Sequence, residues 1–128
     1  MIKRYVFLDD IRYPKDVFNY IPNPIYIEKE WVIVRSYDEF INDVLDNGLS
    51  YLYSYDHDLA DQHYNSHLLK VIDYDKFTEK TGYSCAKWLV NYCIDNNKEL
   101  PKYLLHTMNT VGAVNIDLYF KNYLNQLR

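Results

Sequence analysis

The chain alternates short apolar runs with segments in which apolar residues recur at helical spacing. Four apolar runs, each bounded by polar residues, predict buried β-strands over residues 4–8, 31–34, 51–55 and 103–105. Strands that alternate with helices imply parallel crossover connections. We therefore expect an α/β domain of three layers, α/β/α, whose short parallel sheet has about four strands in the common order 2-1-3-4.

Three amphipathic segments predict the main helices, over residues 36–48, 85–97 and about 111–127. Ser36 followed by Glu39 is typical of a capping box at the start of the first of these helices. A glycine ends the first helix and a pair of asparagines ends the second.

Two connections fit neither pattern. Residues 13–30 contain Pro14, Pro22 and Pro24, which break any long helix, so we expect an irregular crossover with one helical turn. Residues 59–83 are longer than an ordinary loop, and connections of this length usually have a function of their own. We expect a short helix or a flap there.

Composition narrows the classes of function. The 128 residues carry 14 basic and 18 acidic side chains, a net charge of -4, which disfavours general nucleic-acid or membrane-surface binding. The sequence contains no apolar run as long as a membrane span or a signal-peptide core. Cys85 and Cys93 lie about 12 Å apart along a helix, too far for a disulfide. Because the sequence contains no linker or repeat, we expect one domain, residues 1–128. Because the cysteines form no disulfide, we expect the protein in the reducing cytoplasm.

Ionisable and polar side chains follow three of the four predicted strands. They are Asp9 and Asp10 after the first strand, Asp56, His57 and Asp58 after the third, and His106 and Thr107 after the fourth. In an open parallel sheet the ligand crevice lies beyond the carboxyl ends of the strands, where the strand order reverses. Three separate segments should therefore bring these groups to one place.

The aspartates in this set suggest a metal site. Carboxylates that lie close together repel one another unless a cation sits among them, and Mg²⁺ prefers oxygen ligands. We therefore take Asp9, Asp10 and Asp56 as candidate ligands of Mg²⁺. The alternative is that each aspartate only caps the turn or helix that follows its strand.

The histidines are candidates for proton transfer. His57 and His106 could act as base and acid on either side of a phosphorus atom, or could be ordinary hydrogen-bonded residues at strand ends. His63 and His67 have the i, i+4 spacing of a helical metal site, but they lack the acidic partner of that motif and such residues are more often exposed.

Other residues suggest a phosphate site. The guanidinium of Arg12 could bind a phosphate, or could only offset the charge of the nearby aspartates. Thr107, Asn109 and Thr110 precede the last helix, where backbone N–H groups bind anions, although helix capping explains the same residues. The three scattered glycines exclude a P-loop and a dinucleotide-binding fingerprint.

Four strings of the sequence resemble the cyclic-phosphate-processing receiver-like domain family. They are FLDDIRYP at residues 7–14, SYDHDLAD at 54–61, TGYSCAKWL at 81–89 and LLHTMNTVGAVN at 104–115. In that family the last string is typically HS-x-N-P-x-G, so here Thr107 keeps the hydroxyl group and Thr110 replaces the proline.

The resemblance implies a receiver-like, flavodoxin-type sheet with a modified active site. It also implies a role in processing cyclic phosphates of nucleotides or of ADP-ribose derivatives, in RNA repair or phage conflict, in a bacterial or phage-infected cytosol. The site residues that it implies are Asp9, Asp10, Arg12, Asp56, His57, Asp58, His106 and Asn109.

Three hypotheses follow. The first is a phosphoesterase that opens a small cyclic phosphate, with Mg²⁺ on the aspartates, His57 and His106 moving protons, Asp58 orienting a histidine, and Arg12, Thr107 and Asn109 binding substrate. The second is a signalling receiver phosphorylated on Asp56, but the sequence leaves no room for the usual fifth strand and its lysine. The third is a non-catalytic module that binds a small nucleotide-like ligand.

Overall fold

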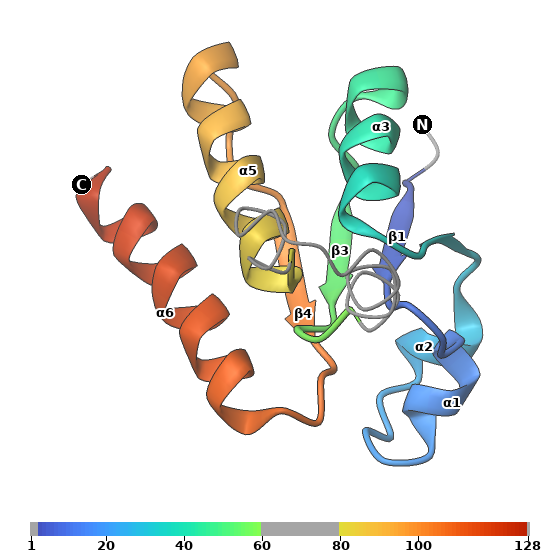
Figure 1. Cartoon of the computed structure of the whole chain (residues 1–128). Helices are drawn as coiled ribbons and strands as arrows, with labels where there is room; N and C mark the ends of the chain where they lie inside the picture. Colours follow the sequence, from blue (N-terminus) through green and yellow to red (C-terminus); the bar gives the residue numbers. More distant parts are fainter. Residues whose placement is uncertain (1–2, 60–79, 128) are drawn as a thin grey trace, which may run out of the picture.

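Four parallel strands form the sheet of this computed structural model, which describes residues 3–59 and 80–127 (Figure 1). The strands are β1 (Tyr5–Leu8), β2 (Trp31–Val34), β3 (Leu52–Tyr55) and β4 (Lys102–Leu105), and their order is β2-β1-β3-β4. Leu8 lies opposite both Val34 and Tyr55, and Tyr55 lies opposite Leu105. The predicted strand order is confirmed, and the four strands end level with one another.

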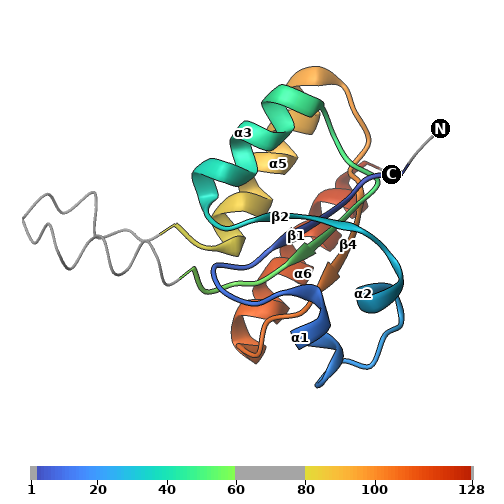
Figure 2. The same cartoon turned by 90° about the vertical axis from the view of Figure 1, so that its right-hand side faces the viewer.

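Helices cover both faces of the sheet. They are α1 (Pro14–Phe18), α2 (Ile25–Glu28), α3 (Tyr37–Asn47), α5 (Gly82–Asn96) and α6 (Thr110–Gln126). Figure 2 shows α3 and α5 on one face and α1 and α2 on the opposite face, and α6 packs against α5 (Figure 1). The predicted three-layer architecture is therefore confirmed. Among the described helices, none has the length and apolar character needed to cross a membrane.

The crossover between β1 and β2 differs from the prediction. It contains the two short helices α1 and α2 instead of a single turn. Pro14 is the first residue of α1, a position whose N–H has no partner inside a helix, so the proline begins a helix there instead of breaking one. The helix or flap expected within residues 59–83 falls largely outside the described residues, since 60–79 are not described.

Local hydrogen bonds fix where α3 and α5 begin. Ser36 Oγ accepts from the backbone N–H of Glu39 (3.1 Å), as in the predicted capping box. The Glu39 carboxylate, however, accepts from the backbone N–H of Arg35 (2.8 Å). Thr81 caps α5 by accepting from the backbone N–H of Ser84, so this helix begins at Gly82, three residues before the predicted start.

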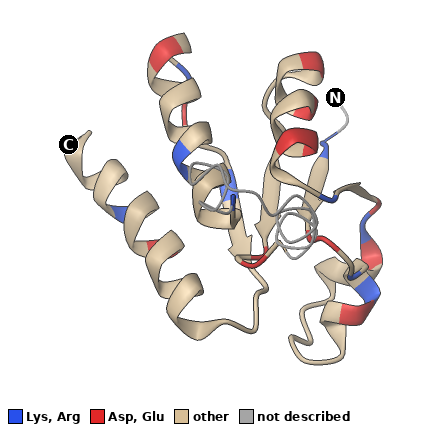
Figure 3. Ribbon diagram, viewed as in Figure 1, with Lys and Arg blue, Asp and Glu red and all other residues tan. Residues whose placement is uncertain are grey.

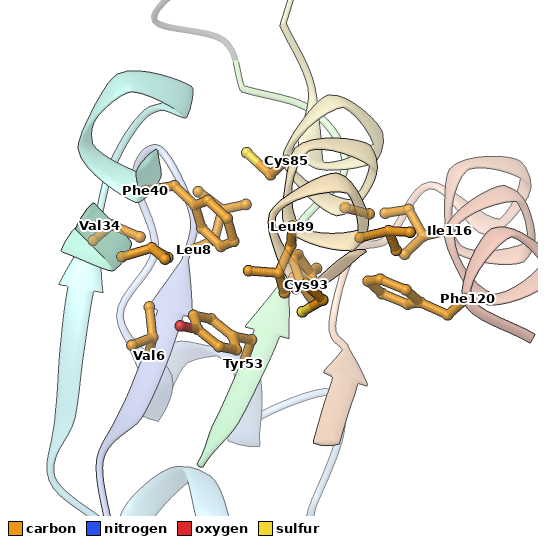
Figure 4. Packing of buried hydrophobic residues seen from close by; sticks show 14 of the residues in the cluster. Val6, Leu8, Val34, Phe40, Tyr53, Cys85, Leu89, Cys93, Ile116 and Phe120 are labelled. Carbon is orange, nitrogen blue, oxygen red and sulfur yellow. The ribbon is translucent and has the colours of Figure 1, made fainter. Parts of the chain in front are cut away.

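The core has two parts because successive side chains of a strand point to opposite faces. The larger part joins Val6 and Leu8 of β1 to residues of α3, α5 and α6, including Phe40, Leu89 and Phe120 (Figure 4). The smaller part, on the other face, consists of Phe7, Val17 and Tyr26. Both cysteines are buried and free, which agrees with the predicted absence of a disulfide.

Two tyrosines of β3 should respond oppositely to loss of the hydroxyl group. The Tyr55 hydroxyl is buried and has no hydrogen-bond partner among the described residues, whereas the Tyr53 hydroxyl accepts from the buried backbone N–H of Ser50 (2.9 Å). Since an unpaired buried polar group is costly, Tyr55→Phe should raise the free energy of unfolding by about 1 kcal/mol and Tyr53→Phe should lower it by about 1 kcal/mol. Urea unfolding of the two variants checks this, and equal effects would contradict it.

Candidate functional site

Three aspartates meet at the carboxyl edge of the sheet. Asp9 and Asp10 follow β1 and Asp56 follows β3, and each offers one carboxylate oxygen within 4.8 Å of the others. Figure 3 shows acidic residues at the ends of these two strands. The structure thus brings together the three predicted metal ligands, which follow strands that pair directly and end level. Their role as ligands stays a prediction.

Asp9 is fully buried and held on both oxygens. Oδ1 accepts from the backbone N–H groups of Ile11 (3.0 Å) and Arg12 (2.8 Å), and Oδ2 lies 3.1 Å from Nε2 of His106. Burial alone would raise the pKa of Asp9, but the hydrogen bonds from His106 and from the backbone lower it to about 2. The carboxylate is therefore ionised and fixed in orientation.

Asp56 lies beside Asp9, but its pKa is shifted in the opposite direction. Burial and the neighbouring charge of Asp9 raise its pKa to about 6, although hydrogen bonds from the Thr107 hydroxyl and from the backbone N–H of His57 (2.9 Å) oppose the increase. The pKa values of the two buried carboxylates are pushed apart because their charges repel each other. A cation between them would relieve this repulsion, so the pair favours cation binding.

Two arginines lie beside the acidic groups. Nη1 of Arg12 is 3.5 Å from Oδ2 of Asp9, and its Nη2 lies 3.6 Å from the sulfur of Met108. Nη1 of Arg35 donates to the backbone carbonyl oxygens of Arg12 (2.7 Å) and Asp9 (3.2 Å) and so holds the loop after β1. Arg35 was not among the predicted site residues, although it follows β2 directly, as the predicted residues follow the other strands.

His57 is oriented by its neighbours. Its Nδ1 lies 2.8 Å from Oδ1 of Asp58, whose pKa is lowered mainly by this contact. The ring packs so closely on α6 that a Cβ atom at Gly112 would lie 2.4 Å from its Cγ, so only glycine fits there. In the described part of the chain, Nε2 makes no hydrogen bond. This arrangement suits a residue that exchanges a proton with a ligand.

His106 has the second of the two environments considered for it, that of a hydrogen-bonded residue at a strand end. Its ring is fully buried and stacks on Phe7, with ring centroids 4.4 Å apart, and burial lowers its pKa. Nδ1 lies 2.7 Å from Oγ of Ser54, and Nε2 is directed at Asp9. Both nitrogens are therefore engaged inside the protein. Ser54 was not among the predicted site residues, and its only signal in the sequence is that it is a small polar residue within a mostly apolar strand.

The loop after β4 contacts the site through two predicted residues. The Thr107 hydroxyl bonds to Asp56 and accepts from the backbone N–H of Asn109 (3.1 Å). Oδ1 of Asn109 caps α6 at Gly112 (2.8 Å), while its Nδ2 donates to Asp58 (3.3 Å). Capping and a place in the site are thus compatible for Asn109. Thr110 begins α6, and His63 and His67 lie outside the described residues.

The donor set fits Mg²⁺. Three carboxylates supply oxygen atoms only, as this hard cation requires, and their grouping, with Asp9 and Asp56 buried, is unfavourable without a positive charge. Within residues 3–59 and 80–127, no donor of nitrogen or sulfur belongs to the group, which sets it apart from a typical zinc site.

A family model described as the cyclic-phosphate processing receiver domain matches residues 4–122. The matched range begins at the residue before β1 and extends into the last turns of α6, so it includes every candidate site residue discussed above. No curated protein and no solved structure matches the chain.

Proposed function

Because the chain belongs to the cyclic-phosphate processing receiver domain family, we propose that it hydrolyses a small cyclic phosphate of a nucleotide or an ADP-ribose derivative. The observation that carries the proposal is the convergence at one sheet edge of Asp9, Asp10 and Asp56, the guanidinium of Arg12, and the oriented ring of His57. Hydrolysis of a phosphodiester can use this combination of a cation site, an anion-binding group and a proton carrier.

Asp9, Asp10 and Asp56 would hold Mg²⁺. When bound, this ion neutralises charge on the phosphate and makes a water molecule more acidic. Arg12, held by Asp9 and by its contact with Met108, would bind a phosphate oxygen. Its geometry depends on Arg35, which holds the carbonyl oxygen of Arg12 itself.

His57 would carry the proton. With Asp58 accepting from Nδ1, the hydrogen of the neutral ring stays on that nitrogen and Nε2 has a free lone pair. Nε2 would take the proton of the attacking water as the new P–O bond forms, and would return it to the ring oxygen that leaves. His106, which we predicted as the second proton carrier, is buried and better suited to holding Asp9.

A non-catalytic nucleotide-binding module remains the main alternative, since the same groups would bind a phosphate without turnover. A phospho-acceptor receiver is less well supported. Asp56 is only 3% exposed, so a phosphodonor has little access to its carboxylate.

The test is ³¹P NMR of the protein with 2′,3′-cyclic nucleotides, ADP-ribose 1″,2″-cyclic phosphate and 3′,5′-cyclic nucleotides, each with Mg²⁺ and with EDTA. We expect a new phosphomonoester signal from one class in Mg²⁺, and none in EDTA. Line broadening without a new signal would favour the binding module. An unchanged spectrum in every sample would contradict both.

A further inference from the structure

A buried chain of hydrogen bonds leads from α2 through the sheet to the acidic cluster. Tyr26 Oη lies 2.7 Å from Ser54 Oγ, Ser54 Oγ lies 2.7 Å from Nδ1 of His106, and Nε2 of His106 lies 3.1 Å from Oδ2 of Asp9. None of the four residues is more than 3% exposed. Side chains from four separate segments are thus linked out of contact with solvent.

The end groups fix the direction of these hydrogen bonds. An ionised Asp9 only accepts, so Nε2 of His106 must carry a hydrogen and donate. Nδ1 then accepts from the Ser54 hydroxyl, whose oxygen accepts from the Tyr26 hydroxyl. If Ser54 instead donated to the oxygen of Tyr26, the hydrogen of the Tyr26 hydroxyl would have no acceptor among the described residues. In this direction every donor is satisfied.

We propose that Tyr26 and Ser54 are positioning residues that act through His106 to hold the Asp9 carboxylate in the orientation that the metal site needs. This proposal rests on the metal site of the proposed function. The backbone holds Oδ1 of Asp9, but only side chains hold Oδ2, and His106 is the closest of them.

Loss of the Ser54 hydroxyl would leave the His106 ring with its stacking on Phe7 and its single bond to Asp9. Nothing polar would then hold Nδ1, and the ring and the carboxylate could turn together. Mutation of a residue that orients a metal ligand by hydrogen bonding typically changes metal affinity 10–100-fold.

The experiment is a titration with Mn²⁺ alone, with free Mn²⁺ measured by EPR, on the wild type and four variants. Ser54→Ala should weaken Mn²⁺ binding by about tenfold or more. Tyr26→Phe should weaken it less, because Ser54 can still donate to His106. Ser54→Thr, which restores the hydroxyl, should recover most of the affinity. Tyr55→Phe, on the opposite face of the same strand, is the matched control and should bind as the wild type does.

An ¹⁵N spectrum of the histidine rings gives a second readout that does not depend on metal. His106 should be the Nε2–H tautomer in the wild type, and its Nδ1 resonance should move in Ser54→Ala. Unchanged Mn²⁺ affinity in Ser54→Ala, with Tm showing that it is folded, would overturn the inference. If the wild type bound no Mn²⁺, the metal site itself would be wrong, and an altered His106 spectrum in Ser54→Ala would then show that the hydrogen-bond chain exists without that role.

Discussion

Asp56→Asn should give a protein that is more stable at pH 7 and has lost its turnover of cyclic phosphate. The substitution removes a charge from the metal site, and we expect a loss of about 10³-fold in kcat. The same charge is unfavourable in the folded protein, because burial and Asp9 raise the pKa of Asp56 from 3.8 to about 6. Removing it should raise the free energy of unfolding by about 3 kcal/mol at pH 7.

The size of this stability effect depends on pH. Between about pH 4 and pH 6 the folded protein binds a proton at Asp56 more tightly than the unfolded chain does, so this group makes stability fall as the pH rises through that range. The gain in Asp56→Asn should therefore be present at pH 7 and absent below pH 4.

Urea unfolding at pH 7 and below pH 4, together with ³¹P assays of turnover, measures both effects. Asp46→Asn, which removes a charge from the exposed side of α3, is the control and should change neither quantity. Loss of stability at pH 7 would show that Asp56 makes interactions that outweigh the cost of its burial. Retained turnover would remove Asp56 from the proposed metal site.

His57→Ala should lower kcat by about 10²–10⁴-fold, the usual contribution of a residue that transfers a proton in the transition state. Mn²⁺ affinity should change little, since the three aspartates remain in place. Asp58→Asn should have a smaller effect, about tenfold, because the amide oxygen can still accept from Nδ1 of His57.

Single-turnover measurements with the substrate found by ³¹P NMR would check this order, with far-ultraviolet circular dichroism as the control for folding. His57→Ala also leaves space beside Gly112, so its Tm should fall slightly. Wild-type turnover in His57→Ala would assign the proton transfer to another group, and equal losses in His57→Ala and Asp58→Asn would make the carboxylate as important as the ring.

Local sequence patterns were sufficient for the strands and most helices, and the strand order followed from the order that is common in such sheets. Apolar runs and capping residues act over a few positions, so the start of α3 follows from Ser36, whereas α5 begins at its cap Thr81, ahead of the apolar pattern that predicted it. Pro14 shows where such rules are ambiguous, because proline both breaks a helix interior and begins a helix. The meeting of Asp9 with Asp56 could also be predicted, since it requires only that two adjacent parallel strands end level.

Tertiary structure decided what each of these polar residues contacts. His106 follows a strand as His57 does, but its ring turns inward between Phe7, Ser54 and Asp9. Arg35 reaches the loop after β1 only because β2 pairs with β1. The physical reason is that strand position is a local property of the chain, whereas the burial of a side chain, its hydrogen bonds and its pKa depend on segments that folding brings beside it.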